Sequence, residues 1–187
     1  MDHYIDIRLR PDPETPPTAL MQTLFGKLHR ALVHLHSEDI GVSFPEFDTR
    51  RRWLGTVLRL HGREERMATM AELSWLQGMQ DQVIAKPPMS APSVSTHRMV
   101  RRVQAHSNAE RIRRRQMRRQ NWTHAEALQH IPDTVERRLE LPFVRLQSSS
   151  TGQAFALHIE QLPEQPNPVP GRFSAYGLSL EATVPWF

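Results

Sequence analysis

The sequence predicts an α+β fold, and three observations predict it. Hydrophobic patterns over residues 3–85 follow the order strand, helix, strand, strand, helix, strand. A Pro- and Ser-rich stretch at residues 87–96 then resembles a linker. Beyond it the pattern changes to short strands around one strongly basic helix. The first six elements match the ferredoxin-like βαββαβ arrangement, so we expect such a domain at residues 1–94. A second domain, with an arginine-rich helix and antiparallel strands, is expected at residues 95–187.

The N-terminal elements follow from where apolar residues recur. Residues 3–9 alternate apolar and polar side chains, which is typical of a strand with one buried face. After the break PDPETPP, apolar residues recur at helical spacing over residues 20–35 and predict an amphipathic helix. Weaker patterns predict strands at residues 40–44, 56–60 and 82–85 and a helix at 64–78.

The second domain is expected to begin with a basic strand that leads into the arginine-rich helix. Ser107 and Glu110 form an S-x-x-E capping box, which predicts that this helix starts at Asn108. A short helix is expected near residues 123–130. The remaining patterns predict strands at residues 143–147, 154–160 and 173–176, the first two joined by the turn SSSTGQ.

Positive charge is concentrated in one segment of the chain. Nine arginines and a single acid, Glu110, lie between Arg98 and Arg119, which gives residues 97–120 a formal charge of +8. The whole chain carries only +4, so the rest of it is net acidic. The chain also has 22 arginines but only 2 lysines. Guanidinium groups bind phosphate oxygens or guanine edges through two hydrogen bonds at once, so this bias indicates a polyanionic partner.

Five of these arginines share one side of the expected helix, on an arc of about 140° at 100° per residue. They are Arg111, Arg114, Arg115, Arg118 and Arg119, whereas Arg113 faces the other way.

The partner of this basic face is open to two interpretations. It could be a face that only contacts solvent, but the charge density favours nucleic acid as a partner. Charge alone leaves DNA and RNA both open. A helix is too wide for the deep groove of A-form RNA, although a short hairpin opens that groove near its ends.

Composition argues against several other classes of protein. Cysteine is absent, so disulfides and thiolate metal sites are excluded, and a reducing cytoplasmic location is expected. The N-terminus has early charges and no apolar signal segment, and no apolar run approaches the length of a membrane span. The ten histidines are scattered and form no H-E-x-x-H motif, so we expect neither a metal nor a cofactor.

A series of short motifs, in order along the chain, resembles one known family. They are DHYIDIRLRPDPE at the start, FGKLH at residues 25–29, IGVSFP at 40–45, RRVQA at 101–105, SNAERIRRRQMRR at 107–119, IPDT at 131–134, LPFV at 141–144, STGQ at 150–153, YGLS at 176–179 and the terminal VPWF. The chain is similar to the CRISPR repeat-processing endoribonucleases of type I-F systems. Loop and surface positions depart from the family pattern, among them His106, where lysine is familiar, and Ala109, where proline is.

The resemblance implies a fold, a substrate and an assembly. It implies a ferredoxin-like domain followed by a domain with an RNA-binding helix, in agreement with the patterns above. The family substrate is precursor CRISPR RNA, cut without metal at the 3′ base of each repeat stem-loop. By resemblance, the enzyme acts once and keeps its product hairpin. It is expected to be a monomer on its own and then a subunit of the type I-F surveillance complex, with no membrane partner.

The resemblance also assigns catalytic residues. Cleavage without metal needs the ribose 2′-OH as nucleophile, and histidine suits the role of base because its ordinary pKa lies near neutrality. His29 lies at the edge of the first helix's apolar stripe, where a surface histidine is the simpler interpretation, and the resemblance implies that it is the base. Ser148 is implied to position the 2′-OH and Tyr176 to orient His29. Ser150 and Thr151 are candidates for contact with the scissile phosphate. The general acid is left unassigned.

Recognition residues are implied in the same way. Arg102 and Gln104 alternate on one strand face and match contacts to a guanine at the stem base and to the next purine. Phe155 matches an aromatic side chain that stacks on the closing base pair, although a core phenylalanine is the alternative. The helix arginines match those that enter the RNA groove, and they are Arg111, Arg114, Arg115, Arg118 and Arg119.

Two other functions compete with an endoribonuclease. The chain could be a non-catalytic RNA-hairpin-binding subunit of a CRISPR ribonucleoprotein, but the presence of His29, Ser148 and Tyr176 favours catalysis. A DNA-binding regulator is disfavoured because the arginine helix follows a β-type domain and no helix-turn-helix precedes it.

Overall fold

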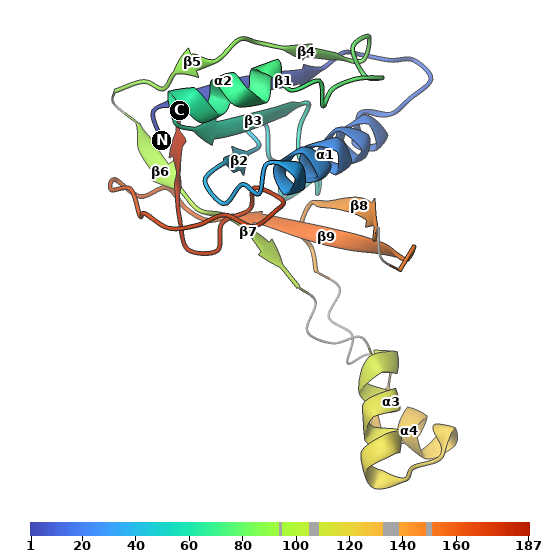
Figure 1. Cartoon of the computed structure of the whole chain (residues 1–187). Coiled ribbons are helices and arrows are strands. Elements are labelled where there is room, and N and C mark those ends of the chain that lie inside the picture. The colour runs from blue at the N-terminus through green and yellow to red at the C-terminus, as the bar shows by residue number, and fades with distance from the viewer. Residues whose placement is uncertain (94, 105–108, 133–138, 149–150) are drawn as a thin grey trace. The chain divides into compact units, whose positions relative to one another are not determined.

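The computed structural model describes residues 1–93, 95–104, 109–132, 139–148 and 151–187. Its elements in chain order are β1 (His3–Leu9), α1 (Pro17–His34), β2 (Gly41–Ser43), β3 (Val57–Gly62), α2 (Glu64–Glu72), β4 (Val83–Ala85), β5 (Met89–Ser90), β6 (Thr96–Arg98), β7 (Val100–Val103), α3 (Ala109–Gln120), α4 (His124–His130), β8 (Phe143–Gln147), β9 (Ala154–Gln161) and β10 (Val184–Trp186). The α+β class is confirmed. The first six elements also follow the predicted βαββαβ order (Figure 1).

An antiparallel sheet forms the centre of the N-terminal half. Its strand order is β2-β3-β1-β4, with β5 also paired to β1. Ile5, Ile7 and Leu9 alternate along β1 and are buried, as the period of two predicts. Helices α1 and α2 bury their apolar residues in the same core.

Helix α1 has the stripe that the sequence predicts. Pro17 occupies its first turn, where the missing N–H of proline costs no intrahelical hydrogen bond. One side of the helix is then fully buried, through Leu20, Met21, Leu24, Phe25, Leu28, Ala31 and Leu32. The other side keeps Lys27, His29, Arg30 and His34 at least partly exposed, so this helix is a core element that also offers polar groups to a ligand.

The strands β7, β9 and β8 form a second antiparallel sheet, in that order. Val100, Val144, Leu157 and Ile159 point from it into the same core as the N-terminal sheet. β10 pairs with β6. Residues Met1–Val103 and Leu141–Phe187 therefore form one compact unit, which we call the first unit.

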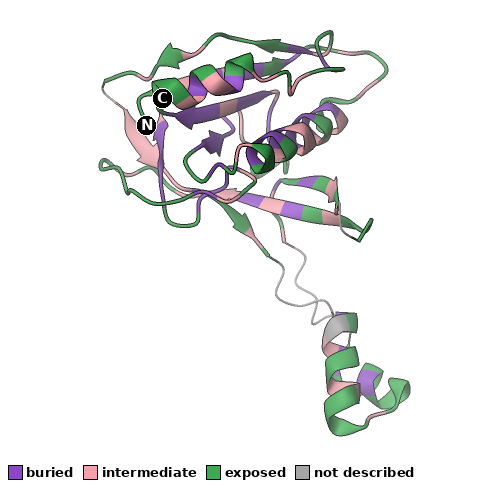
Figure 2. Cartoon of the chain, in the orientation of Figure 1, coloured by how far each residue is buried: buried purple, intermediate pink, exposed green. Residues whose placement is uncertain are grey.

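Residues Gln104–Glu140 form the other compact unit, which we call the helical unit. Its α3 and α4 are mostly exposed, and Ala109, Ala127 and Ile131 are its buried apolar residues (Figure 2). Thr123 and Glu126 cap α4 with a reciprocal capping box. The buried Arg113 donates from Nε to the carbonyl oxygen of Ile131 at 2.7 Å. Arg113 thus faces inward, as predicted.

Three local predictions are wrong. The helix predicted at 64–78 ends at Glu72, because Leu73 is extended and the apolar residues after it are half-buried in turns rather than in a helix. The stretch 87–96 is no free linker, since Met89–Ser90 pairs with β1. No strand forms at 173–176, where Phe173 makes only a single bridge to Ser179 and the chain reverses.

The division of the chain into domains stays a prediction. The two compact units have other boundaries than the expected domains at residues 1–94 and 95–187, which were predicted from the element order and the Pro- and Ser-rich stretch. The helix start at Asn108 and its cap Ser107 lie outside the described residues. Within the described part of the chain, no helix combines the length and apolar character needed to cross a membrane.

Candidate active site

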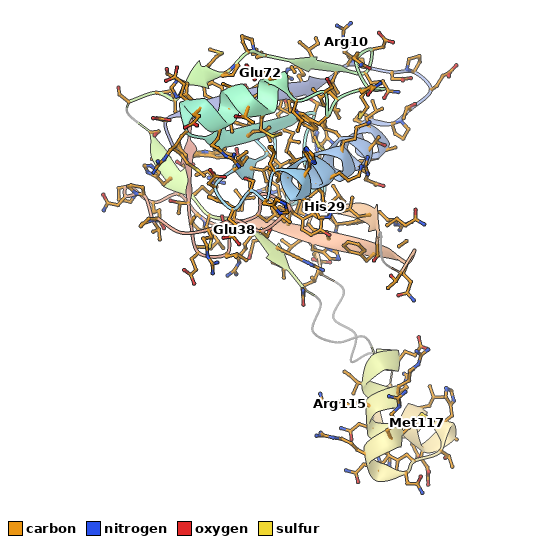
Figure 3. The ribbon with its side chains drawn as sticks, viewed as in Figure 1. Arg10, His29, Glu38, Glu72, Arg115 and Met117 are labelled. Atoms are coloured by element: carbon orange, nitrogen blue, oxygen red, sulfur yellow. The ribbon has the colours of Figure 1, made fainter. Side chains whose placement is uncertain are left out.

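A cleft of about 810 Å³ lies in the first unit between α1 and the β8–β9 hairpin. Predicted site residues from distant parts of the sequence line it together: His29 from α1, Ser148 after β8, Phe155 from β9 and Tyr176 from a C-terminal loop. Figure 3 shows His29 on the side of α1 toward these strands. The fold therefore brings the expected catalytic trio and the expected stacking aromatic to one surface.

His29 is half-buried and its imidazole is held on two sides. Nδ1 lies 2.8 Å from the carbonyl oxygen of Ala175. The ring stacks on Tyr176, with centroids 4.0 Å apart and planes 12° from parallel. A carbonyl oxygen only accepts hydrogen bonds, so Nδ1 must carry the proton. The lone pair of the neutral ring is then on Nε2, which is the atom able to act as a base.

The loop that supplies Ala175 and Tyr176 is itself fixed. Gly177 donates to the carbonyl of Ser174 at 2.8 Å, and Ser174 donates to that of Leu178 at 2.8 Å. Gly177 has a φ of 69°, and a Cβ there would lie 2.7 Å from Val42, so glycine is needed for both backbone and space. A tight turn thus presents the carbonyl and the ring to His29.

Ser148 begins the turn between β8 and β9. Its Oγ accepts a hydrogen bond from the N–H of Thr151 at 3.3 Å, and its backbone pairs with Gln153 and Gly152. Ser148 is half-buried, so the turn fixes a hydroxyl at the cleft wall. Thr151 is exposed in the same turn, and Ser150 lies outside the described residues.

Phe155 lies where β9 reaches the cleft. It shares a sheet face with the buried Leu157 and Ile159 but remains half-exposed, as a stacking platform requires. The guanidinium of Arg102 lies 5.7 Å from its ring centroid. Arg102 is exposed on β7, and Gln104 is exposed just after that strand. The placement of Arg102 beside Phe155 joins two of the predicted recognition residues.

The helical unit presents the arginines of α3 to solvent. Arg115, Arg118 and Arg119 are exposed, and Figure 3 shows Arg115 projecting from the helix. Arg114 is also exposed and pairs with Glu110 one turn earlier. The side chain of Arg111 lies outside the described residues. Four of the five predicted groove arginines are thus available on the helix surface.

Known proteins resemble this chain along its length. The family model "CRISPR-associated protein (Cas_Csy4)" matches residues 4–187. The chain belongs to this family. Two curated relatives, both named "CRISPR-associated endonuclease Cas6/Csy4", match over the full length of each chain. The one from Pseudomonas aeruginosa (strain UCBPP-PA14) is 51% identical over 187 residues, and the one from Escherichia coli (strain UTI89 / UPEC) is 40% identical. The predicted resemblance is confirmed.

Two cations of this Cas_Csy4 chain were missed by the sequence reasoning. Arg30 and Arg145 are exposed and line the cleft beside the predicted catalytic residues. Neither makes a hydrogen bond or ion pair to any residue that the structure describes. Such a cationic wall suits an anionic ligand such as a phosphate group. Their signal in the sequence is weak, since an arginine on an exposed helix or strand face usually needs no special explanation.

The described part of the chain offers no cluster of metal ligands. Among its residues, no three or more His, Cys, Asp or Glu side chains gather as a metal ion would require. The titratable groups of the cleft are instead His29 and Tyr176, flanked by the guanidinium groups of Arg30 and Arg145. The functional groups that the cleft offers therefore include an imidazole, hydroxyl groups and cations, of which His29, Ser148 and Arg30 are examples.

Proposed function

We propose that this chain is a metal-independent endoribonuclease that cuts precursor CRISPR RNA at the 3′ base of each repeat stem-loop. The observation that best supports the proposal is the fixed His29 imidazole in a cleft shared with Ser148. Membership of the Cas_Csy4 family and relatives named as CRISPR-associated endonucleases point the same way. The reaction needs no cofactor.

The chemistry uses the RNA's own hydroxyl. Nε2 of His29 removes the proton of the 2′-OH next to the scissile phosphate, and Ser148 aligns that hydroxyl. The 2′ oxygen forms a bond to phosphorus while the bond from phosphorus to the 5′ oxygen breaks, and the leaving oxygen takes up a proton. The products are a 2′,3′-cyclic phosphate and a 5′-OH. Tyr176 acts through His29 as a positioning residue.

Recognition is assigned to a separate set of residues. Arg102 and Gln104 read base edges at the lower stem, and each bidentate contact is worth about 1–3 kcal/mol of discrimination. Phe155 stacks on the closing base pair, and Ser150 and Thr151 contact the scissile phosphate. The helix arginines bind the groove, and they are Arg111, Arg114, Arg115, Arg118 and Arg119. Because these contacts survive the cut, the enzyme turns over once and keeps the product hairpin.

The proposal extends to the setting of the protein. It acts in the cytoplasm, where its transcript is made, and it is a monomer before assembly. With its product bound it joins the other protein subunits of the type I-F surveillance complex. The catalytic residues are divided between an N-terminal domain at 1–94, with His29, and an RNA-binding domain at 95–187, with Ser148 and Tyr176.

Cleavage of the cognate repeat hairpin in EDTA tests this function. We expect full activity, a 2′,3′-cyclic phosphate on one product and a 5′-OH on the other. A single 2′-deoxy substitution before the cut should abolish cleavage and leave the affinity within about twofold, because one hydroxyl adds little to many phosphate contacts. Activity that needs a divalent metal, or cleavage of the deoxy substrate, would reject the mechanism. Tight binding without cleavage would instead indicate the non-catalytic subunit.

A further inference from the structure

Gly26 lies in the middle of α1, where glycine is an unfavourable residue. It leaves the unfolded chain more conformational freedom than alanine does, so it destabilises a helix. A glycine inside a helix therefore usually has a packing reason or a functional one. Gly26 precedes His29 by one helical turn, and both residues line the cleft.

Packing does not explain this glycine. A Cβ at this position would lie 3.8 Å from Cδ2 of Leu146 and 3.9 Å from Nη1 of Arg30, and no described atom of another segment would come closer. Both are ordinary van der Waals distances. Gly26 is also not among the glycines that have a positive φ. Alanine would therefore fit the folded protein at this position.

All other glycines of the chain have a reason of this kind. Each of them either has a left-handed φ or would place a Cβ within 3.1 Å of another residue, and they are Gly41, Gly55, Gly62, Gly78, Gly152, Gly171 and Gly177. Gly26 has neither reason. The space that its missing side chain leaves in the cleft is the remaining explanation.

The space over Gly26 is open and cationic. Gly26 itself is partly exposed, and Leu146 of β8 lies on the other side of this space. The guanidinium of Arg30 reaches back along α1 to Gly26, as long side chains of a helix tend to do. No acidic residue is among those that line the cleft. An anion over Gly26 would therefore meet a guanidinium without a competing carboxylate.

We propose that the missing side chain of Gly26 leaves room for the scissile phosphodiester, which Arg30 binds through a non-bridging oxygen. The inference rests on the proposed function and extends its site along α1. His29 follows one turn later on the same helix face, so the phosphodiester lies beside the imidazole. A Cβ at residue 26 would displace the phosphorus from the line between the attacking 2′ oxygen and the leaving 5′ oxygen. Such a displacement slows the reaction and leaves the contacts to the stem intact.

Gly26→Ala should make the protein more stable and a slower enzyme. Alanine favours the helix, so the melting temperature should rise by about 1–4 °C. The single-turnover cleavage rate at saturating protein should fall by roughly 10- to 100-fold. The affinity for the hairpin should stay within about twofold of wild type, because the residues assigned to the stem are unchanged. A slower rate in a more stable protein cannot come from damage to the fold.

Gly78→Ala is the matched control, because it adds the same atoms elsewhere. Gly78 has a φ of 79°, no described atom beyond its chain neighbours lies within 4 Å of a Cβ there, and it does not line the cleft. Its left-handed backbone disfavours alanine, so the melting temperature should fall by about 2–4 °C. The cleavage rate should remain that of wild type.

Arg30→Gln tests the identity of the ligand at the same place. Glutamine keeps a polar side chain but loses the charge and the guanidinium fork that pair with a phosphate. We expect a single-turnover rate at least about 10-fold lower, because the developing charge on the phosphate loses a donor. The affinity for the hairpin should again stay close to that of wild type.

The outcomes separate this inference from the proposed function. A wild-type rate in Gly26→Ala or in Arg30→Gln overturns the inference. A slower Gly26→Ala protein with a lower melting temperature also overturns it, because a damaged helix then explains the rate. In each of these cases wild-type protein still cuts the hairpin. Wild-type protein that cuts no hairpin in EDTA counts instead against the proposed function.

Discussion

The imidazole of His29 and the phenol ring of Tyr176 lie nearly parallel, with centroids 4.0 Å apart. Tyr176 is stacked in turn on Phe25, whose ring is fully buried in the core, at 6.3 Å and 4°. The hydroxyl of Tyr176 has no hydrogen-bond partner among the described residues. The aromatic ring, more than the hydroxyl, therefore fixes the orientation of His29.

Substitutions of Tyr176 should distinguish the contribution of its aromatic ring to the cleavage rate from that of its hydroxyl group. Tyr176→Phe keeps the stack, so we expect its cleavage rate to stay within about threefold of wild type. Tyr176→Leu removes a stack worth about 0.5–1.5 kcal/mol, which corresponds to a rate roughly 2- to 10-fold lower. Single-turnover kinetics on the repeat hairpin measure both. A Phe variant as slow as the Leu variant would show that the hydroxyl matters instead.

Ser148→Ala should slow cleavage without unfolding the turn. The Oγ accepts a long hydrogen bond from the N–H of Thr151, and loss of that bond should cost about 1 kcal/mol of folding free energy. We expect at least a tenfold lower rate and an unchanged hairpin affinity. Gly152→Ala is the structural comparison. Its φ of 67° disfavours alanine, so the free energy of unfolding should fall by about 1 kcal/mol. A normal rate in Ser148→Ala would remove Ser148 from the chemistry.

The arginines of α3 differ in solvent exposure, and we expect exposed and buried ones to have different roles. Arg115 and Arg119 are exposed, and Arg115→Gln/Arg119→Gln should reduce the slope of log affinity against log salt by about 0.9 for each phosphate that is no longer neutralised. Arg113 is buried and donates to Ile131, so Arg113→Gln should lower hydrogen-exchange protection in α3 and α4 and change the slope less. Equal salt slopes in wild type and the double variant would place this helix face outside the interface.

Buried His61 predicts a pH-dependent stability. Burial, and secondarily the charge of Arg59, lowers the pKa of His61 from 6.5 to about 3. The folded protein keeps it neutral while the unfolded chain protonates below pH 6.5. The free energy of unfolding should therefore fall as the pH drops from 6.5 toward 3, by at most about 1.4 kcal/mol per pH unit from this group.

Urea unfolding between pH 5 and 7 measures this contribution. His61→Gln should lose part of the slope of the unfolding free energy against pH, whatever its absolute stability. His36→Asn is the control, because His36 is exposed and asparagine tolerates its left-handed φ of 46°. If His61→Gln keeps the wild-type slope of unfolding free energy against pH, His61 is not the source of that slope.

Much of the fold was predictable because its signals are local. The alternation along β1 and the stripe along α1 both follow from burial of one face, and both form as predicted. The predicted strand at 173–176 failed because Gly177 takes a left-handed turn, and its carbonyl oxygen accepts a hydrogen bond from the N–H of Val42 at 2.9 Å. Such contacts between distant segments leave no periodic pattern in the sequence.

The candidate site was only partly predictable. His29, Ser148 and Tyr176 came from the resemblance, and only the tertiary fold brings them to one cleft. The partner of His29 is a backbone carbonyl, that of Ala175, and any residue could supply it. Arg30 gave no distinctive signal, because an arginine beside a helix histidine is typical of an exposed face.

The most direct test of the central claim is single-turnover cleavage of the repeat hairpin by His29→Ala, with the affinity measured on the same RNA. Loss of a positioned general base lowers a rate by about 100- to 10,000-fold. The account predicts a loss in this range with an affinity close to that of wild type. Cleavage at the wild-type rate would contradict it, because the imidazole held by Ala175 and Tyr176 would then have no part in the reaction.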